Sequence, residues 1–204
     1  MNDDLDILKE VGNIAAGHGS IALSEILGRK LRLHVPVTDV VIGQQIPTFI
    51  NIDRIVVAVY SKILVGLQGE AAFIMDEKNA YKLIDMSCRI KKDEKAAGLL
   101  TEVGVSFLKE IGNVVIGAYI NALSLMLRRC ILPPLPTLIS GSIEDILNIL
   151  FAPYASDDYS YLVEAVFEED DEKIKGSFYL ILTPDAARDI RDTCKKLLND
   201  ISNG

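Results

Sequence analysis

The feature of this chain that most constrains its fold is an internal repeat. The segment LKEVGNIAAGHG at Leu8–Gly19 returns a hundred residues later as LKEIGNVVIGAY at Leu108–Tyr119. Between Asp6–Pro36 and Ser106–Pro136, twelve of 31 aligned positions are identical. A repeat of this kind means that one supersecondary unit is used twice. The fold must therefore accommodate two similar halves.

The second half is longer than the first. GEAAFIMDEKNAYKLIDM resembles GSFYLILTPDAARDIRDT, but the displacement has grown from 100 to 107 residues. The extra length includes GSIEDILNILFAPYA, which has the apolar spacing of a helix. The corresponding part of the first half, VTDVVIGQQIPTF, has no such pattern. We expect a helix near Ser142–Leu150 that only the second half carries.

Hydrophobic periodicity predicts the other elements. The expected helices are Asp3–Gly28, Asp76–Cys88, Asp93–Arg129 and Asp185–Ile201, and the expected strands are Leu31–Val35, Arg54–Lys62, Leu64–Met75, Tyr159–Glu168 and Lys173–Thr183. Each half thus contains a helix, a strand, a two-stranded hairpin and a helix. Neither half has enough chain for a comfortable core of its own. We therefore expect an α+β fold, with one domain over residues 1–204 made of two pseudo-symmetric repeats (about 1–91 and 92–204) that share a β-sheet.

Composition excludes some classes of partner. The 204 residues carry a net charge of −8 and the isoelectric point is near 4.8. Nucleic acids and anionic membranes recruit Lys and Arg, so neither is an expected partner. The most apolar stretch, VVIGAYINALSLML, contains Asn121 and Ser124 and falls short of the roughly 20 residues that span a bilayer. We read it as a buried helix and expect no membrane insertion.

The amino-terminal segment MNDDLDILKE lacks the apolar core of a signal peptide. The three cysteines are scattered and form no CxxC pair. This usage is typical of a reduced compartment, so we expect a cytoplasmic protein.

The repeated polar residues share one helix face. They are spaced i, i+4, i+7 and i+11, which is a single stripe on an α-helix. The two stripes are Asp6, Glu10, Asn13 and Gly17 in the first repeat and Ser106, Glu110, Asn113 and Gly117 in the second. Glycine inside a helix costs about 1 kcal/mol relative to alanine, so a repeated one needs a reason. Close approach of a partner and internal helix–sheet packing would both explain it.

The residue types limit the chemistry of these stripes. No nucleophile with an adjacent base is visible, and the two histidines, His18 and His34, are not repeated. A metal site would need more carboxylates or imidazoles at ligand spacing. An amide can orient a water molecule by donating and accepting hydrogen bonds, as a glutamine does in GTP hydrolysis. A recognition surface without catalysis fits the stripes as well.

The same residues resemble the signature of a known family. They resemble the pattern of the CheC/CheX/FliY family of chemotaxis phosphatases. That pattern is Asp or Ser, three residues, Glu, two residues, Asn, 22 residues and Pro. The chain contains it twice, as Asp6, Glu10, Asn13 and Pro36 and as Ser106, Glu110, Asn113 and Pro136. The length, the duplication and the inserted helix favour the CheC branch. CheX normally keeps one functional motif, and FliY adds a flagellar-switch domain.

The resemblance implies a function. In this family the substrate is the phosphorylated response regulator CheY. Carried over, Asn13 and Asn113 would orient the attacking water, and Glu10 and Glu110 would pair with the active-site lysine of CheY. Mg²⁺ would be held by CheY, and this chain would bind no cofactor of its own.

The family also binds CheD, a receptor deamidase, through the inserted helix. Here that helix would present Glu144, Asp145 and Asn148, and Asp145 would be the main polar contact. Its apolar residues would pack it onto the body: Ile143, Ile146, Leu147 and Leu150. Two alternatives to an enzyme remain: an adaptor that binds phosphorylated CheY or CheD without hydrolysis, and a structural component related to the flagellar rotor proteins.

Overall fold

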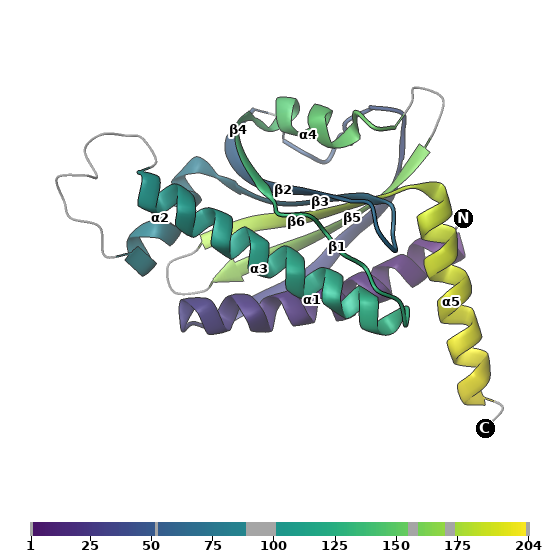
Figure 1. Cartoon of the computed structure of the whole chain (residues 1–204). Helices are drawn as coiled ribbons and strands as arrows, with labels where there is room; N and C mark the ends of the chain where they lie inside the picture. Colours follow the sequence, from purple (N-terminus) through teal and green to yellow (C-terminus); the bar gives the residue numbers. More distant parts are fainter. Residues whose placement is uncertain (1, 52, 89–100, 155–158, 170–173, 203–204) are drawn as a thin grey trace.

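Six antiparallel strands form one sheet at the centre of the molecule (Figure 1). The computed structural model describes residues 2–51, 53–88, 101–154, 159–169 and 174–202. The strands are β1 (Leu31–Ile42), β2 (Ile55–Ile63), β3 (Gly69–Asp76), β4 (Thr137–Ser142), β5 (Tyr159–Glu169) and β6 (Ile174–Leu182). The helices are α1 (Asn2–Leu27), α2 (Glu77–Cys88), α3 (Glu102–Met126), α4 (Ile143–Phe151) and α5 (Pro184–Ser202). The predicted α+β fold is confirmed.

The strand order shows how the two repeats combine. The order is β1-β5-β6-β3-β2-β4. Strands β1, β2 and β3 of the first repeat correspond to β4, β5 and β6 of the second. Exchanging each strand for its counterpart and reading from the opposite edge gives the same order. The first repeat's β1 therefore pairs with the second repeat's hairpin, and β4 pairs with the first repeat's hairpin. The sheet is shared, as the repeat predicts, and each repeat supplies an edge strand to the other.

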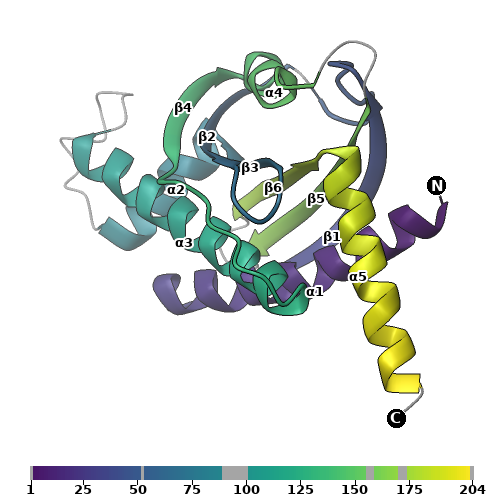
Figure 2. The same ribbon diagram turned by 45° about the vertical axis from the view of Figure 1, so that its right-hand side comes forward.

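Helices cover both faces of the sheet. Helices α1 and α3 lie side by side on one face, and α2 and α5 complete that layer, while α4 lies alone on the opposite face (Figures 1 and 2). The larger apolar core lies between the sheet and α1, α2, α3 and α5. A second core lies between the sheet and α4. This arrangement leaves the outer surfaces of α1 and α3 free of the sheet.

Helix α3 is both long and apolar. By length and composition it is the one helix among the described residues that could cross a membrane. A core helix of a globular protein passes the same test, and the inner face of α3 has that character. Its buried residues include Leu108, Ile111, Val115 and Tyr119, which lie in the larger core. The expectation of a buried helix is confirmed for this face.

Several predicted boundaries were wrong. β1 continues to Ile42 instead of ending at Val35, because its partner β5 offers a long edge across the repeats. Residues 64–68 are outside the strands, and β3 begins at Gly69. α3 begins at Glu102, because the Thr101 hydroxyl caps it by accepting from the Gly104 N–H at 3.1 Å. The part of the expected helix before Thr101, at 93–100, lies outside the described residues, as does most of the turn between β5 and β6.

Candidate active site

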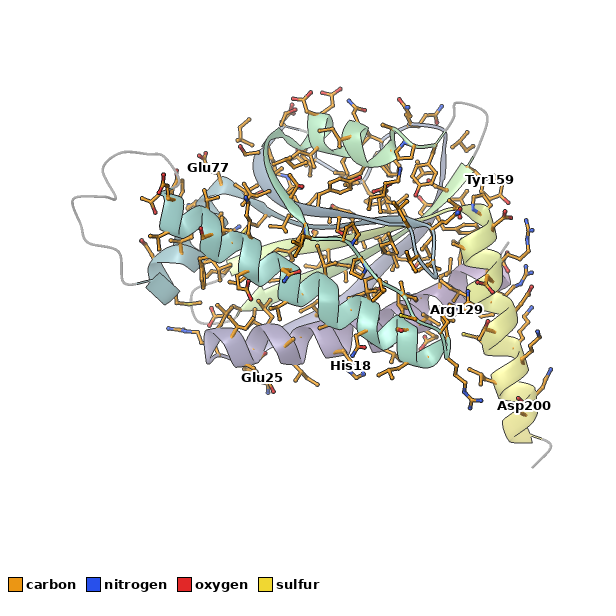
Figure 3. All side chains as sticks on the ribbon, viewed as in Figure 1. His18, Glu25, Glu77, Arg129, Tyr159 and Asp200 are labelled. Carbon is orange, nitrogen blue, oxygen red and sulfur yellow. The ribbon has the colours of Figure 1, made fainter. Side chains whose placement is uncertain are left out.

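The two polar stripes lie on neighbouring helices, on surface that the sheet does not cover. Asp6, Glu10, Ser106 and Glu110 are exposed, while Asn13 is half-buried and Asn113 is exposed. Figure 3 shows His18, on α1 just beyond the first stripe, on the side of the helix turned away from the sheet. The structure thus brings two similar carboxylate–amide pairs to one helical layer. His18 has no counterpart in the second repeat, where residue 118 is alanine.

The repeated glycines fall into two kinds. A Cβ atom added at Gly12 would lie 2.9 Å from the Val163 side chain, and one added at Gly112 would lie 2.4 Å from Val59. These two glycines allow the helices to pack closely on the sheet. At Gly17 and Gly117 an added Cβ would meet nothing within 4 Å. Internal packing therefore explains Gly12 and Gly112 but not the glycines of the stripes.

The two asparagines differ in their surroundings. The Val35 N–H donates to Asn13 Oδ1 at 3.0 Å. Because a backbone N–H needs an acceptor, this bond decides which end of the carboxamide faces β1 and leaves the NH₂ group to other partners. The Asn113 side chain forms no hydrogen bond within the part of the chain that the structure describes. In the second repeat, Leu135 occupies the position that corresponds to Val35. Leu135 is 87% exposed, whereas Val35 is 4% exposed.

This difference predicts unequal effects on stability. Asn13→Ala leaves the half-buried Val35 N–H without its acceptor and should lower the free energy of unfolding by about 1 kcal/mol. Asn113→Ala removes an exposed side chain and should change it by less than about 0.5 kcal/mol. Denaturant unfolding of the two single variants measures both values. Equal losses would contradict the asymmetry between the sites.

A hollow of about 370 Å³ lies beside the first stripe. Two residues of the first motif, Asp6 and Pro36, help to line it, together with Lys9 and Thr38. The Thr38 hydroxyl is buried and has no partner among the described residues. The motif proline and the first motif residue thus meet across the gap between α1 and β1, although 30 residues separate them in the chain.

Helix α4 has the predicted two faces. Its apolar residues Ile143, Ile146, Leu147 and Leu150 are at most 1% exposed, and Glu144, Asp145 and Asn148 are exposed. Glu144 and Asn148 also line a hollow of about 530 Å³ shared with the loop around Pro47. Asp145 is part of the helix cap: its N–H donates to Ser142 Oγ at 3.1 Å, and that hydroxyl donates to Asp145 Oδ2 at 2.6 Å.

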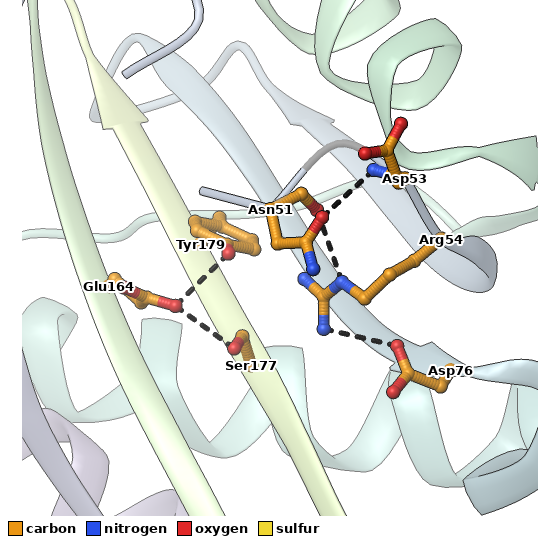
Figure 4. Close-up of polar contacts among 7 residues, drawn as sticks. All are labelled: Asn51, Asp53, Arg54, Asp76, Glu164, Ser177 and Tyr179. Atoms are coloured by element: carbon orange, nitrogen blue, oxygen red, sulfur yellow. Dashed lines mark hydrogen bonds and ion pairs between the residues drawn. The ribbon is translucent and has the colours of Figure 1, made fainter. Parts of the chain in front are cut away.

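Polar clusters at the two ends of the α4 face were not anticipated from the sequence. At one end, Ser177 and Tyr179 both donate to Glu164 Oε1 at 3.0 Å, and Arg54 pairs with Asp76 beside a cavity of about 300 Å³ (Figure 4). Burial, reinforced by Glu164, raises the pKa of Tyr179. These residues come from β3, β5 and β6 and from Arg54, directly before β2, so only the strand order could have revealed the cluster.

At the other end lies Glu70, which is 2% exposed. Burial raises the pKa of its carboxyl, while a hydrogen bond from Tyr60 and the charge of Lys62 act in the opposite direction. One of its oxygens has no partner among the described residues. In the same described part of the chain, no three His, Cys, Asp or Glu side chains are grouped to hold a metal ion.

Comparison with known proteins finds similarity to the CheC-like family in part of the chain. Residues 4–39, which span the first motif, match the CheC-like family. The chain is 29% identical over 136 residues to the CheY-P phosphatase CheC of Bacillus subtilis, an alignment that covers 66% of this chain and 65% of that protein.

The fold agrees with the sequence. FliY of Thermotoga maritima matches with a TM-score of 0.77 and 24% identity, over 96% of this chain and 98% of that one. CheX, in its complex with CheY, BeF₃ and Mg²⁺ from Borrelia burgdorferi, matches with a TM-score of 0.52 and 17% identity, over 82% of this chain and 95% of that one. In its first motif, its sequence relative and its fold, the chain thus resembles the CheC-like family.

Proposed function

We propose that this protein hydrolyses the aspartyl phosphate of a phosphorylated CheY-type response regulator. The observation that carries the proposal is the pair of carboxylate–amide stripes on α1 and α3, placed on surface that the sheet leaves uncovered. The sequence relative that is a CheY-P phosphatase and the fold neighbour solved with CheY support it. A surface site fits this substrate, because the phosphoryl group arrives on a folded partner and needs no deep pocket in this chain.

The proposed roles follow from the side chains. Asn13 and Asn113 orient the water that attacks phosphorus, since an amide can both donate to and accept from a water molecule. Phosphoryl transfer depends mainly on positioning and electrostatic stabilisation, so one well-placed amide can act without a nucleophile. Glu10 and Glu110 pair with a lysine of the regulator. Mg²⁺ belongs to the regulator's own site in this proposal.

A phosphate-release assay tests the proposal. The protein is mixed with a large excess of a phosphorylated CheY-type regulator and Mg²⁺, and the rate is compared with that of the regulator alone. Each molecule of this protein should release many phosphates. Binding without accelerated release would identify a non-enzymatic adaptor instead, and the absence of both would support a structural role.

The glutamates are expected to act mainly in docking. Breaking a desolvated charge pair across an interface from one side typically costs about 2–5 kcal/mol. The double change Glu10→Lys and Glu110→Lys should therefore raise the Michaelis constant for the regulator at least ten-fold, and more than Glu10→Gln with Glu110→Gln. Initial rates over a range of regulator concentrations measure the effect. An unchanged concentration dependence in both double variants would rule out this docking role.

We also propose that the outer face of α4 binds CheD. The helix is the extra element of the second repeat and lies on the opposite face of the sheet from α1 and α3. A partner there would leave both stripes accessible. The exposed residues Glu144, Asp145 and Asn148 would make the contact.

A pull-down with purified CheD tests this face. Asp145→Lys should abolish the association and leave phosphate release nearly unchanged. Because Asp145 also belongs to the helix cap, Ser142→Ala is the matched control: it breaks the same cap without changing the charge. Failure of the wild type to bind CheD, or equal loss in both variants, would remove the contact from the proposal.

A further inference from the structure

The edge strand β1 is irregular where it passes the first asparagine. β1 pairs with β5 up to His34 and resumes at Val37, and the register shifts between them. Two residues, Val35 and Pro36, thus lie opposite the single residue Ala165, which is the arrangement of a β-bulge. Proline has no N–H for the sheet ladder and is found at edges and bulges. The position of Pro36 fits both properties.

The bulge gives the Val35 N–H a different partner. Val35 is absent from the ladder with β5, and its N–H donates to Asn13 Oδ1 at 3.0 Å. Val35 lies 22 positions after Asn13, and Pro36 comes directly after Val35. The motif spacing between Asn13 and Pro36 therefore reflects the hydrogen bond that Val35 donates to Asn13. A carboxamide held through its oxygen keeps its NH₂ group in one orientation. Gly12, next to Asn13, packs against Val35 and Val163 and holds α1 close enough for the bond.

We infer that the bulge at Val35–Pro36 is a positioning device for the first site. It holds the Val35 N–H out of the ladder, and this N–H orients the Asn13 carboxamide toward the reacting water. The inference rests on the proposed phosphatase function. The second site is built differently, because β4 begins only at Thr137, directly after Pro136, and Leu135 is 87% exposed. The first site is thus the preorganised one.

The test removes a single donor. In an Asn113→Ala background, which silences the second site, the Val35 amide is replaced by an ester through the α-hydroxy acid analogue of valine. We expect kcat to fall roughly ten-fold with KM changed less than about two-fold, since a displacement of about 1 Å can cost on the order of 100-fold. The matched control is the same ester at Val103, in the first turn of α3, where helix N–H groups have no intrahelical acceptor. It should leave both constants unchanged.

A second measurement does not depend on activity. A scalar coupling across the hydrogen bond, between the Val35 nitrogen and the Asn13 side-chain carbonyl carbon, should be present in the parent. It should disappear in Pro36→Ala if the regained N–H draws the strand into regular pairing, and it should persist in Pro47→Ala. Absence of the coupling in the parent overturns the inference. The inference is also overturned if the Val35 ester abolishes the hydrogen bond but leaves kcat unchanged, or if it raises KM and does not lower kcat.

These outcomes are distinct from failure of the proposed function. If the parent with both asparagines intact does not accelerate phosphate release, the phosphatase proposal fails and the catalytic role of the bulge fails with it. If the parent is active and only the ester leaves kcat unchanged, the phosphatase proposal stands and the positioning role is overturned.

Discussion

A double variant with Asn13→Ala and Asn113→Ala is expected to bind the phosphorylated regulator but to release phosphate about 100-fold more slowly than the parent. Both glutamates that we propose for docking remain in this variant, so binding should be retained. What is lost is the amide that we propose to orient the water, and a reacting water displaced by about 1 Å costs on the order of 100-fold. Phosphate release measures the rate, and calorimetry with the regulator carrying BeF₃ and Mg²⁺ measures the binding.

The control for this variant is another exposed asparagine. Asn121 lies two turns beyond Asn113 on α3, outside the motif. Asn121→Ala should keep full activity. Because Asn13→Ala also costs stability through Val35, the folded fraction of each variant is checked by circular dichroism before rates are compared. A folded double variant with most of its activity would show that the amides do not position the water.

The sequence was sufficient for the stripes and for most of the elements, although β4 (Thr137–Ser142) was not among the predicted strands. Both depend on periodicity within a single segment: the positions of Glu10 and Asn13 on one face of α1 follow from helical spacing alone. The two faces of α4 were predicted in the same way and are confirmed, with Ile143 and Leu147 fully buried and Asp145 exposed. Local pattern carries this information because side-chain direction repeats with the helix.

The pairing of strands could not be predicted in this way. The exchange joins β1 to a strand more than a hundred residues away and β4 to one 77 to 87 residues away. Periodicity within one strand does not say which strand lies beside it. The Glu164–Tyr179 pair and the Val35–Asn13 bond both depend on that pairing. For the motif proline, the sequence showed the spacing of 22 residues, but only the bulge shows why a proline stands there.

The glycines were the point at which the sequence left two explanations open. Gly12, Gly17, Gly112 and Gly117 are all repeated helix glycines. The structure separates them, because only the first member of each pair lies against the sheet. Since Gly17 and Gly117 carry the usual cost of a helix glycine and meet nothing inside the molecule, we expect that they leave room for the docked regulator.

Filling that room should weaken docking while stabilising the fold. Gly17→Leu with Gly117→Leu should raise the Michaelis constant for the regulator at least ten-fold, because each leucine projects from the stripe that the partner approaches. The same change should raise the free energy of unfolding by up to about 1 kcal/mol per site, since leucine is a far better helix former than glycine. Initial rates and denaturant unfolding on the same samples measure the two effects.

Alanine at the packed glycines is the matched contrast. Gly112→Ala places a Cβ 2.4 Å from Val59 and should destabilise the fold by about 1–3 kcal/mol, the usual cost of overpacking. Its Michaelis constant should stay near that of the parent under conditions where the variant is folded, because the outer face is unchanged. We expect the free energy of unfolding to rise in the leucine double variant and to fall in Gly112→Ala, with docking weakened only in the leucine variant. This result would show that Gly17 and Gly117 serve the partner, whereas Gly112 serves helix packing. A leucine double variant that docks normally would leave these two glycines without a functional reason.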